Sequence, residues 1–396
     1  TAELPQGSVI VLSAPPGPQF LVACCAAWLR RCVVLWADDR APAASLRKLA
    51  VRFEATAIWQ VASTGGLADG LPGPPHFTGF SAKLWPEACA IKLTSGSSGV
   101  PNGILVTGAQ LESDGRALAQ VMQFGQADRI LASVPMSHSY GFSVLALPAL
   151  YSGSKIILPE DRCPLLAAAE HGGTVLPSVP SWYRAQVERA EELKVPASIR
   201  LLISAGEVLS ARVAKEFTRR TGSRIHVLYG ASECGAIAFD LDGTAAERGG
   251  VGHLLPGVQA QLKDSAAGRG RLAVRSAAVG LRCVPDEVPD RLSQGEFVSE
   301  DIAELRDREV FLHGREFGWI KVKGKRVDLR EIAEILEEHE HVSEVLVYSR
   351  KDKDGDTVLC AAVATRNHPL AYRDLVALSR VRLEGWKFPR SIIFVP

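Results

Sequence analysis

The sequence lacks an excess of charge of either sign, because 45 Lys and Arg residues stand against 44 Asp and Glu residues in a chain of 396. Net charge therefore gives no support to a nucleic-acid partner or to an anionic membrane surface. The longest apolar stretch, residues 20–29, ends at Arg30 and Arg31 and is too short to span a bilayer. We expect no nucleic-acid partner and no membrane span.

The sequence also lacks a Cys-x-x-Cys pair among its eight cysteines, which argues against a zinc ribbon or a dithiol redox motif. Scattered single cysteines are typical of reduced, buried thiols. Residues 1–16 contain no basic segment followed by an apolar run, so no signal peptide is predicted. The expected location is the cytoplasm.

Two domains are expected, since the chain is longer than one hydrophobic core usually supports. Short β-branched runs alternate with helical patterns through the first two thirds, as in residues 8–15, 19–31 and 32–36. This strand–helix–strand alternation predicts a parallel sheet. The fold class is therefore predicted to be α/β, with layered sheets in a large N-terminal domain.

The pattern changes after about Gly250, where short runs separated by glycines predict antiparallel strands in a small barrel-like part. From Gly314 it changes again, to a hairpin at 319–329, a helix at 330–340 and two strands within 342–365. We place the domain boundary there. The prediction is a large domain at 1–314 and a small α+β domain at 315–396.

One stretch, "LTSGSSGVPNG" at residues 93–103, has the composition of a phosphate-binding loop. Its glycines let backbone amides turn toward an anion without a Cβ clash, and Thr94 and the serines add hydroxyl donors. No Gly-Lys-Ser/Thr follows at the spacing of a Walker motif. Taken alone, the same residues also suit a plain flexible loop.

Three other segments follow predicted strands and carry polar or aromatic side chains: "PMSHSYGF" at 135–142, "ISAGEVLS" at 203–210 and "YGASECG" at 229–235. The carboxyl ends of strands are where open α/β sheets bind ligands. Each signal is weak by itself, because a lone His138 is more often structural and a turn glutamate such as Glu233 is more often solvated. Their combination favours a binding site at one edge of the sheet.

Together these motifs resemble the adenylate-forming superfamily, which includes acyl- and aryl-CoA synthetases, the adenylation domains of peptide synthetases and firefly luciferase. The resembling segments are the phosphate loop at 93–103, the adenine and magnesium motif at 229–233, a following signature at 252–257, the ribose-binding aspartate motif at 297–305, and the hinge with the first strands of the small domain at 314–327. They occur in the family's order, from about residue 8 onward.

The resemblance implies that ATP, Mg²⁺ and CoA are used, with catalytic roles for Ser232, Glu233 and Arg315. Tyr229 would stack on the adenine, Asp301 would bind the ribose and Glu233 would hold Mg²⁺. The residues implied in nucleotide binding are Thr94, Ser95, Gly96, Ser97, Ser98, Gly99, Gly206, Glu207, Val208, Tyr229, Gly230, Ala231, Ser232, Asp301 and Arg315.

The reaction that the resemblance implies is attack of a substrate carboxylate on the α-phosphorus, loss of pyrophosphate, and transfer of the acyl group to a thiol. The thiol belongs to CoA, or alternatively to the phosphopantetheine arm of an acyl carrier protein. The expected acid pocket is an apolar slot formed by His138, Tyr140, Gly141, Phe142, Val179, Pro180, Ser204 and Ala205.

An aromatic acid is the first choice of substrate, because residues 177–185 together with "SAGE" look most like benzoate-type aryl-CoA ligases. A medium-chain fatty acid is the second choice, and a hydroxylated acid stays open. Amino acids are disfavoured, since residues 135–145 hold no aspartate to bind an α-ammonium group.

Four positions depart from the family pattern. Asn102 stands where the phosphate loop usually has Lys, Phe317 where the hinge usually has Asp or Lys, and Glu300 where the ribose motif usually has Gly. The sequence also stops before the family's C-terminal Gly-Lys motif, which we expect to follow residue 396. These departures leave open a degenerate nucleotide- or acyl-binding module without turnover.

Overall fold

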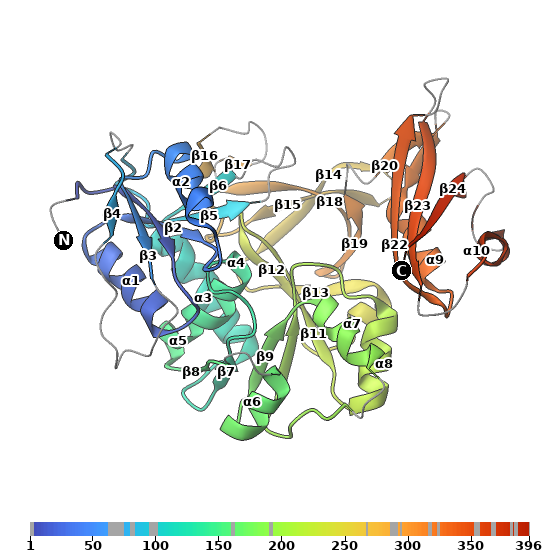
Figure 1. Cartoon of the computed structure of the whole chain (residues 1–396), viewed down its shortest axis with the longest axis horizontal. Coiled ribbons are helices and arrows are strands. Elements are labelled where there is room, and N and C mark those ends of the chain that lie inside the picture. Colours follow the sequence, from blue (N-terminus) through green and yellow to red (C-terminus); the bar gives the residue numbers. More distant parts are fainter. Residues whose placement is uncertain are drawn as a thin grey trace. The chain divides into compact units, whose positions relative to one another are not determined.

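A computed structural model gives the structure of the chain. It describes residues 4–61, 75–79, 84–94, 102–159, 163–189, 193–266, 268–285, 292–293, 295–315, 319–322, 325–351, 357–365, 370–380, 383 and 387–395. The chain divides into two compact units (Figure 1). The larger comprises residues 1–268, 272–299 and 304–311, and the smaller comprises 269–271, 300–303 and 312–396.

The first sheet of the larger unit has seven strands in the order β16-β6-β5-β2-β1-β3-β4. The four strands from β5 to β3 run parallel, as the alternating sequence predicts, and antiparallel strands flank them. The bounds are β1 (Val9–Ser13), β2 (Val33–Ala37), β3 (Ala57–Gln60), β4 (His76–Phe77), β5 (Ala90–Thr94), β6 (Asn102–Val106) and β16 (Arg282–Val284).

A second sheet has twelve strands, in the order β14-β15-β18-β19-β13-β12-β11-β10-β9-β7-β8 with β17 beside β18. Its part from β8 to β11 is parallel, and antiparallel pairing begins at β12. The strands predicted after Gly250 thus extend this sheet. The bounds are β7 (Arg129–Leu131), β8 (Lys155–Ile157), β9 (Val175–Ser178), β10 (Leu201–Ser204), β11 (Ile225–Ala231), β12 (Gly235–Phe239), β13 (Gly250–Leu254), β14 (Gln259–Ala266), β15 (Arg269–Arg275), β17 (Leu292–Ser293), β18 (Glu296–Arg306) and β19 (Glu309–Arg315).

Two helices of the larger unit, α3 and α8, have side-chain caps at their first turn. Thr107 and Gln110 form a capping box before α3, and Gly222, with φ of 72°, ends α8 at the predicted Thr-Gly stop. The bounds are α1 (Pro18–Leu29), α2 (Ala43–Arg52), α3 (Gly108–Met122), α4 (Ser139–Gly141), the π-helical turn η2 (Phe142–Ala146), α5 (Leu147–Ser152), α6 (Pro164–His171), α7 (Pro180–Glu188), α8 (Ala211–Thr221) and the 3₁₀ turn η3 (Ala246–Arg248).

The two faces of the first sheet are covered by different helices. Alternate side chains of its strands pack with Leu46 and Phe53 around α2 on one face. On the other face Trp36 of β2 stacks on Phe142 of η2, with ring centroids 4.1 Å apart. Figure 1 shows α1 and α2 beside the blue strands of this sheet. The segment that begins at residue 139 is thereby fixed between sheet and helices.

The smaller unit is an α+β fold with its own core of Val, Ile and Leu side chains. The predicted hairpin, helix and strand pair are all confirmed, and β23 continues into a parallel pair with β24. The bounds are β20 (Trp319–Val322), β21 (Lys325–Asp328), α9 (Leu329–Glu337), β22 (Val342–Lys351), β23 (Thr357–Thr365), α10 (Tyr372–Arg380) and β24 (Ser391–Val395). Across the described ranges, none of the helices is both long enough and apolar enough to cross a membrane.

The core around α2 generates a stability prediction. Leu46 is fully buried, so Leu46→Ala should lower the free energy of unfolding by about 2–5 kcal/mol. Leu29→Ala is the matched control on a helix, because Leu29 is 84% exposed, and it should change stability by about 0.5 kcal/mol or less. Urea unfolding followed by tryptophan fluorescence measures both. Equal losses in the two variants would contradict the packing described.

Candidate functional site

The parallel register of β9, β10 and β11 brings several of the predicted residues to one end of the sheet. Ser204 at the end of β10 lies between Ser178 of β9 and Val227 of β11. Val179 and Pro180 follow β9, and the turn at 205–208 follows β10. Next to them β11 continues through Tyr229 to Ala231, where the turn at 232–234 begins.

Tyr140 joins this edge from the segment after β7. Its hydroxyl donates toward the carbonyl oxygens of Ser178 and Ile203, at 3.2 and 3.4 Å, and so reaches the ends of β9 and β10. Burial raises the pKa of Tyr140 well above its ordinary value, despite the bond to Ser178. The phenol therefore stays protonated and serves as a fixed wall of the site.

Ser204 is the most unusual polar residue at this edge. Its side chain is 1% exposed, and its hydroxyl has no hydrogen-bond partner in the described part of the chain. Buried hydroxyls are nearly always paired, so this one, next in the chain to the Ile203 carbonyl that Tyr140 bonds, is a candidate ligand contact. Among the residues predicted to bind the acid, this one has the clearest unsatisfied chemistry.

The other predicted acid-pocket residues lie around Tyr140 with different exposures. His138 is exposed, and its carbonyl oxygen accepts the Phe142 amide at 2.8 Å. Gly141 lies so close to the Pro135 carbonyl that any Cβ would clash, which explains the glycine. The ring of Phe142 is fully buried in the aromatic cluster around Trp36, so it supports the segment from behind.

The adenine and magnesium motif forms a tight hairpin between β11 and β12. Ala231 pairs with Gly235, and Ser232, Glu233 and Cys234 make the turn. The Ser139 hydroxyl donates to the Ser232 hydroxyl at 2.9 Å. The hairpin is thus tied to the segment that carries Tyr140, which joins the predicted nucleotide and acid residues in one place.

The turn after β10 lies beside this hairpin. Ser204, the last residue of β10, is paired with Val227 of β11, and Gly206 and Tyr229 each follow two positions later. Gly206 has a φ of 92°, a conformation that side chains disfavour. Glu207 is exposed and Val208 is 40% exposed, so this turn is open to a ligand.

A buried carboxylate supports the hairpin between β11 and β12. Asp114 of α3 is 2% exposed, and its Oδ1 accepts the Ala236 amide at 2.9 Å while its Oδ2 accepts the Ser143 hydroxyl at 2.6 Å. The Cβ of any other residue at Gly235 would meet this carboxylate at 2.6 Å. Asp114 therefore fixes the position of Glu233 through α3, η2 and β12.

The predicted phosphate loop is described only at its two ends. Ser95, Gly96, Ser97, Ser98 and Gly99 lie outside the described residues, as does Phe317. Thr94 and Asn102 pair across the base of the loop, and the Thr94 hydroxyl donates to the Asn102 carbonyl at 3.3 Å. The Arg52 guanidinium donates to the Asn102 side-chain oxygen at 2.6 Å. A cation thus adjoins the position where the family pattern has Lys.

Two predicted nucleotide residues belong to strands near the division between the units. Asp301 lies in β18, in a segment grouped with the smaller unit, and Arg315 is the last residue of β19. Their predicted contacts with ribose and phosphate stay predictions.

Sequence reasoning missed the residues that support the site, namely Arg52, Lys92, Asp114, Ser139 and Ser143. Lys92 had a local signal, because a charged residue interrupts the apolar strand "CAIKL". Asp114 had none, since its partner Ala236 is 122 positions away.

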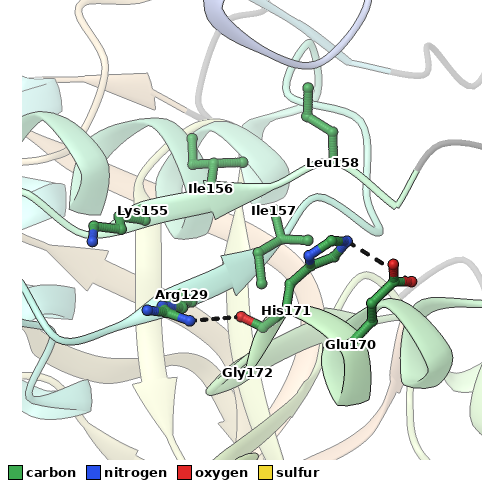
Figure 2. A pocket seen from close by; sticks show the side chains of 8 residues that line it. All are labelled: Arg129, Lys155, Ile156, Ile157, Leu158, Glu170, His171 and Gly172. Atoms are coloured by element: carbon green, nitrogen blue, oxygen red, sulfur yellow. Dashed lines mark hydrogen bonds and ion pairs between the residues drawn. The ribbon is translucent and has the colours of Figure 1, made fainter.

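A separate hollow of about 590 Å³ lies along the edge strand β8 of the second sheet and beside the end of α6, and Figure 2 shows its lining. Arg129 and Lys155 begin β7 and β8, and Arg129 donates to the His171 carbonyl at 2.8 Å. None of the residues predicted for the site lines this hollow, so it is separate from the candidate site.

Comparison with known proteins decides the family. Residues 78–281, more than half of the chain, match the family model described as AMP-binding enzyme, and residues 331–396 match the AMP-binding enzyme C-terminal domain. The chain belongs to the AMP-binding enzyme family. The predicted membership of the adenylate-forming superfamily is confirmed.

Several curated relatives are CoA ligases. The chain is 28% identical over 356 residues to sulfoacetate–CoA ligase of Cupriavidus necator, covering 85% of this chain and 68% of that protein. It is 25% identical over 333 residues to a long-chain-fatty-acid–CoA ligase of Bacillus subtilis, covering 79% and 59%. It is 27% identical over 315 residues to malonate–CoA ligase of Arabidopsis thaliana, and the match covers 71% of this chain and 52% of that protein. The chain thus spans between about half and two thirds of these relatives' lengths.

Solved structures share the fold of this AMP-binding enzyme. ATP-bound MatB of Rhodopseudomonas palustris superposes with a TM-score of 0.86 at 21% identity, covering 99% of this chain and 85% of that one. The o-succinylbenzoate CoA synthetase of Bacillus subtilis with its acyl-adenylate gives 0.82 at 18% identity, covering 98% and 85%. The predicted fold class is confirmed.

The support beneath the hairpin generates a prediction. Asp114→Ala would leave the buried Ala236 amide and Ser143 hydroxyl unpaired, so it should lower the free energy of unfolding by about 2 kcal/mol or more. Asp114→Asn should cost less, because an amide oxygen can still accept the Ala236 N–H. Glu112→Ala is the control on the same helix, since its side chain is 44% exposed. Thermal or urea unfolding ranks the three, and any other order would contradict the role given to Asp114.

Proposed function

We propose that the protein activates a carboxylic acid with ATP to an acyl-adenylate, releases pyrophosphate, and transfers the acyl group to the thiol of CoA. The proposal rests on three features that lie at one edge of the sheet. They are the segment with Tyr140, the unpaired Ser204 hydroxyl and the hairpin that carries Glu233. Membership of the AMP-binding enzyme family and the CoA-ligase relatives support it.

The chemistry requires positioning and charge neutralisation more than a covalent nucleophile, because carboxylate and α-phosphate repel one another. In the proposed arrangement, Tyr229 and the turn at 206–208 hold the adenine. The Ser232 hydroxyl faces the α-phosphate, with its direction set by Ser139. The acid lies between Tyr140 and Ser204, which brings its carboxylate toward that phosphate.

Glu233 is the proposed ligand for Mg²⁺. In the described part of the chain, no group of three or more His, Cys, Asp and Glu side chains gathers to hold a metal ion. Mg²⁺ bound to a nucleotide commonly needs only one or two carboxylates beside phosphate and water, so a single half-buried Glu233 fits. The metal would supply charge neutralisation at the phosphates.

For the substrate we propose an aromatic acid first and a medium-chain fatty acid second. Tyr140, Val179, Pro180 and Ala205 form an apolar surround with the Ser204 hydroxyl as a polar group for orientation. The relatives act by name on fatty acids, sulfoacetate and malonate, so the panel of acids tested must include small dianions.

ATP–pyrophosphate exchange over such a panel tests the proposal. Exchange with one acid, followed by a thioester mass on addition of CoA, is the expected result. A thioester that forms only on a phosphopantetheinylated carrier protein would mean that the acceptor is a carrier protein and not CoA. Nucleotide binding without exchange for any acid, in the full-length protein, would contradict the proposal and favour a binding module.

Glu233→Gln should reduce the exchange rate by more than about tenfold at limiting Mg²⁺, because the amide is a weaker metal ligand. Added Mg²⁺ should recover part of the loss. Glu216→Gln on α8 is the control, since that carboxylate only pairs with Arg219 at the surface. An unchanged Mg²⁺ dependence in Glu233→Gln would remove this residue from the metal site.

A further inference from the structure

Lys92 is a lysine with little exposed surface and no partner within bonding distance for its side chain among the described residues. It lies in β5 with 2% of its surface exposed. Within the described residues, its ammonium makes no hydrogen bond and no ion pair. Lysines are almost never fully buried unless paired, because desolvating a charge without compensation is costly. An ammonium group in such surroundings favours the binding of an anion.

The side chain of Lys92 faces the hairpin that carries Glu233. Its neighbours Ile91 and Leu93 pack with the core around α2, so Lys92 projects from the other face of the sheet. Opposite Lys92 in the register is Ile104, whose side chain lies against Gly280. Gly280 in turn donates its amide to the Glu233 carbonyl at 2.8 Å.

Asp114, the buried carboxylate that supports the same hairpin, accepts hydrogen bonds from the Ser143 hydroxyl and the Ala236 amide. Among the described residues it forms no ion pair with Lys92.

We propose that Lys92 binds the polyphosphate of the nucleotide and stabilises the departing pyrophosphate. The proposal rests on the proposed function. Thr94, two residues further along the same face of β5, begins the predicted phosphate loop. Glu233, the proposed ligand for Mg²⁺, belongs to the hairpin that Lys92 faces. A fixed cation at this place compensates the charge that grows on the leaving phosphates.

Equilibrium binding of ATP and of AMP, each with Mg²⁺, tests the role of Lys92. Lys92→Met should weaken ATP binding by at least about tenfold, the usual effect of losing a charged hydrogen bond, while AMP binding changes less than about twofold. Lys92→Arg should retain most of the ATP affinity. Lys155→Met removes an exposed lysine from β8 and should change neither ligand.

Each outcome of these binding measurements supports or overturns the role of Lys92. An unchanged ratio of ATP to AMP affinity in a folded Lys92→Met variant would overturn the role of Lys92 and leave the proposed function standing. Wild-type protein that binds neither nucleotide would overturn the proposed function together with it. If Lys92→Met does not fold, Lys92→Gln replaces it, since the amide keeps a polar group but no charge. Equal losses of ATP and AMP affinity would indicate a structural role and also overturn the proposal.

Discussion

Parallel pairing of β9, β10 and β11 is the constraint on which the candidate site depends. Because their registers align Ser178, Ser204 and Val227, the segments after β9 and β10 lie next to the continuing strand β11. Tyr140 then closes this edge by donating to two of the strand ends. A shift of one residue in any strand would turn Ser204 away and separate Gly206 from Tyr229. The proposed site thus depends on sheet register.

A second requirement is charge balance beneath the hairpin that carries Glu233. Asp114 fixes β12 and η2 through two hydrogen bonds, while Lys92 and Glu233 place opposite charges near the same buried thiol, Cys234. The hydrogen bond between Asp114 and the Ala236 amide fixes the backbone at the start of β12. Lys92, by contrast, has no hydrogen bond or ion pair among the described residues. We infer that support and ligand binding are divided between these side chains.

The sequence predicted what depends on local pattern. The first strand–helix–strand unit and the glycine stop at Gly222 are continuous segments, and the structure has both as expected. Contacts between distant segments were beyond such reasoning, as with Asp114 and Ala236 or Arg52 and Asn102. The extension of the second sheet beyond β12 was also missed, because a run of antiparallel strands has the same sequence pattern in a barrel and in an open sheet.

The most direct test of the account is a crystal structure of the protein with a nonhydrolysable acyl-adenylate analogue. The account predicts the adenine against Tyr229 and the turn at 206–208, the phosphate mimic at Ser232, and the acyl group between Tyr140 and Ser204. Density for the analogue elsewhere on the molecule, with these residues left uncontacted, would contradict it.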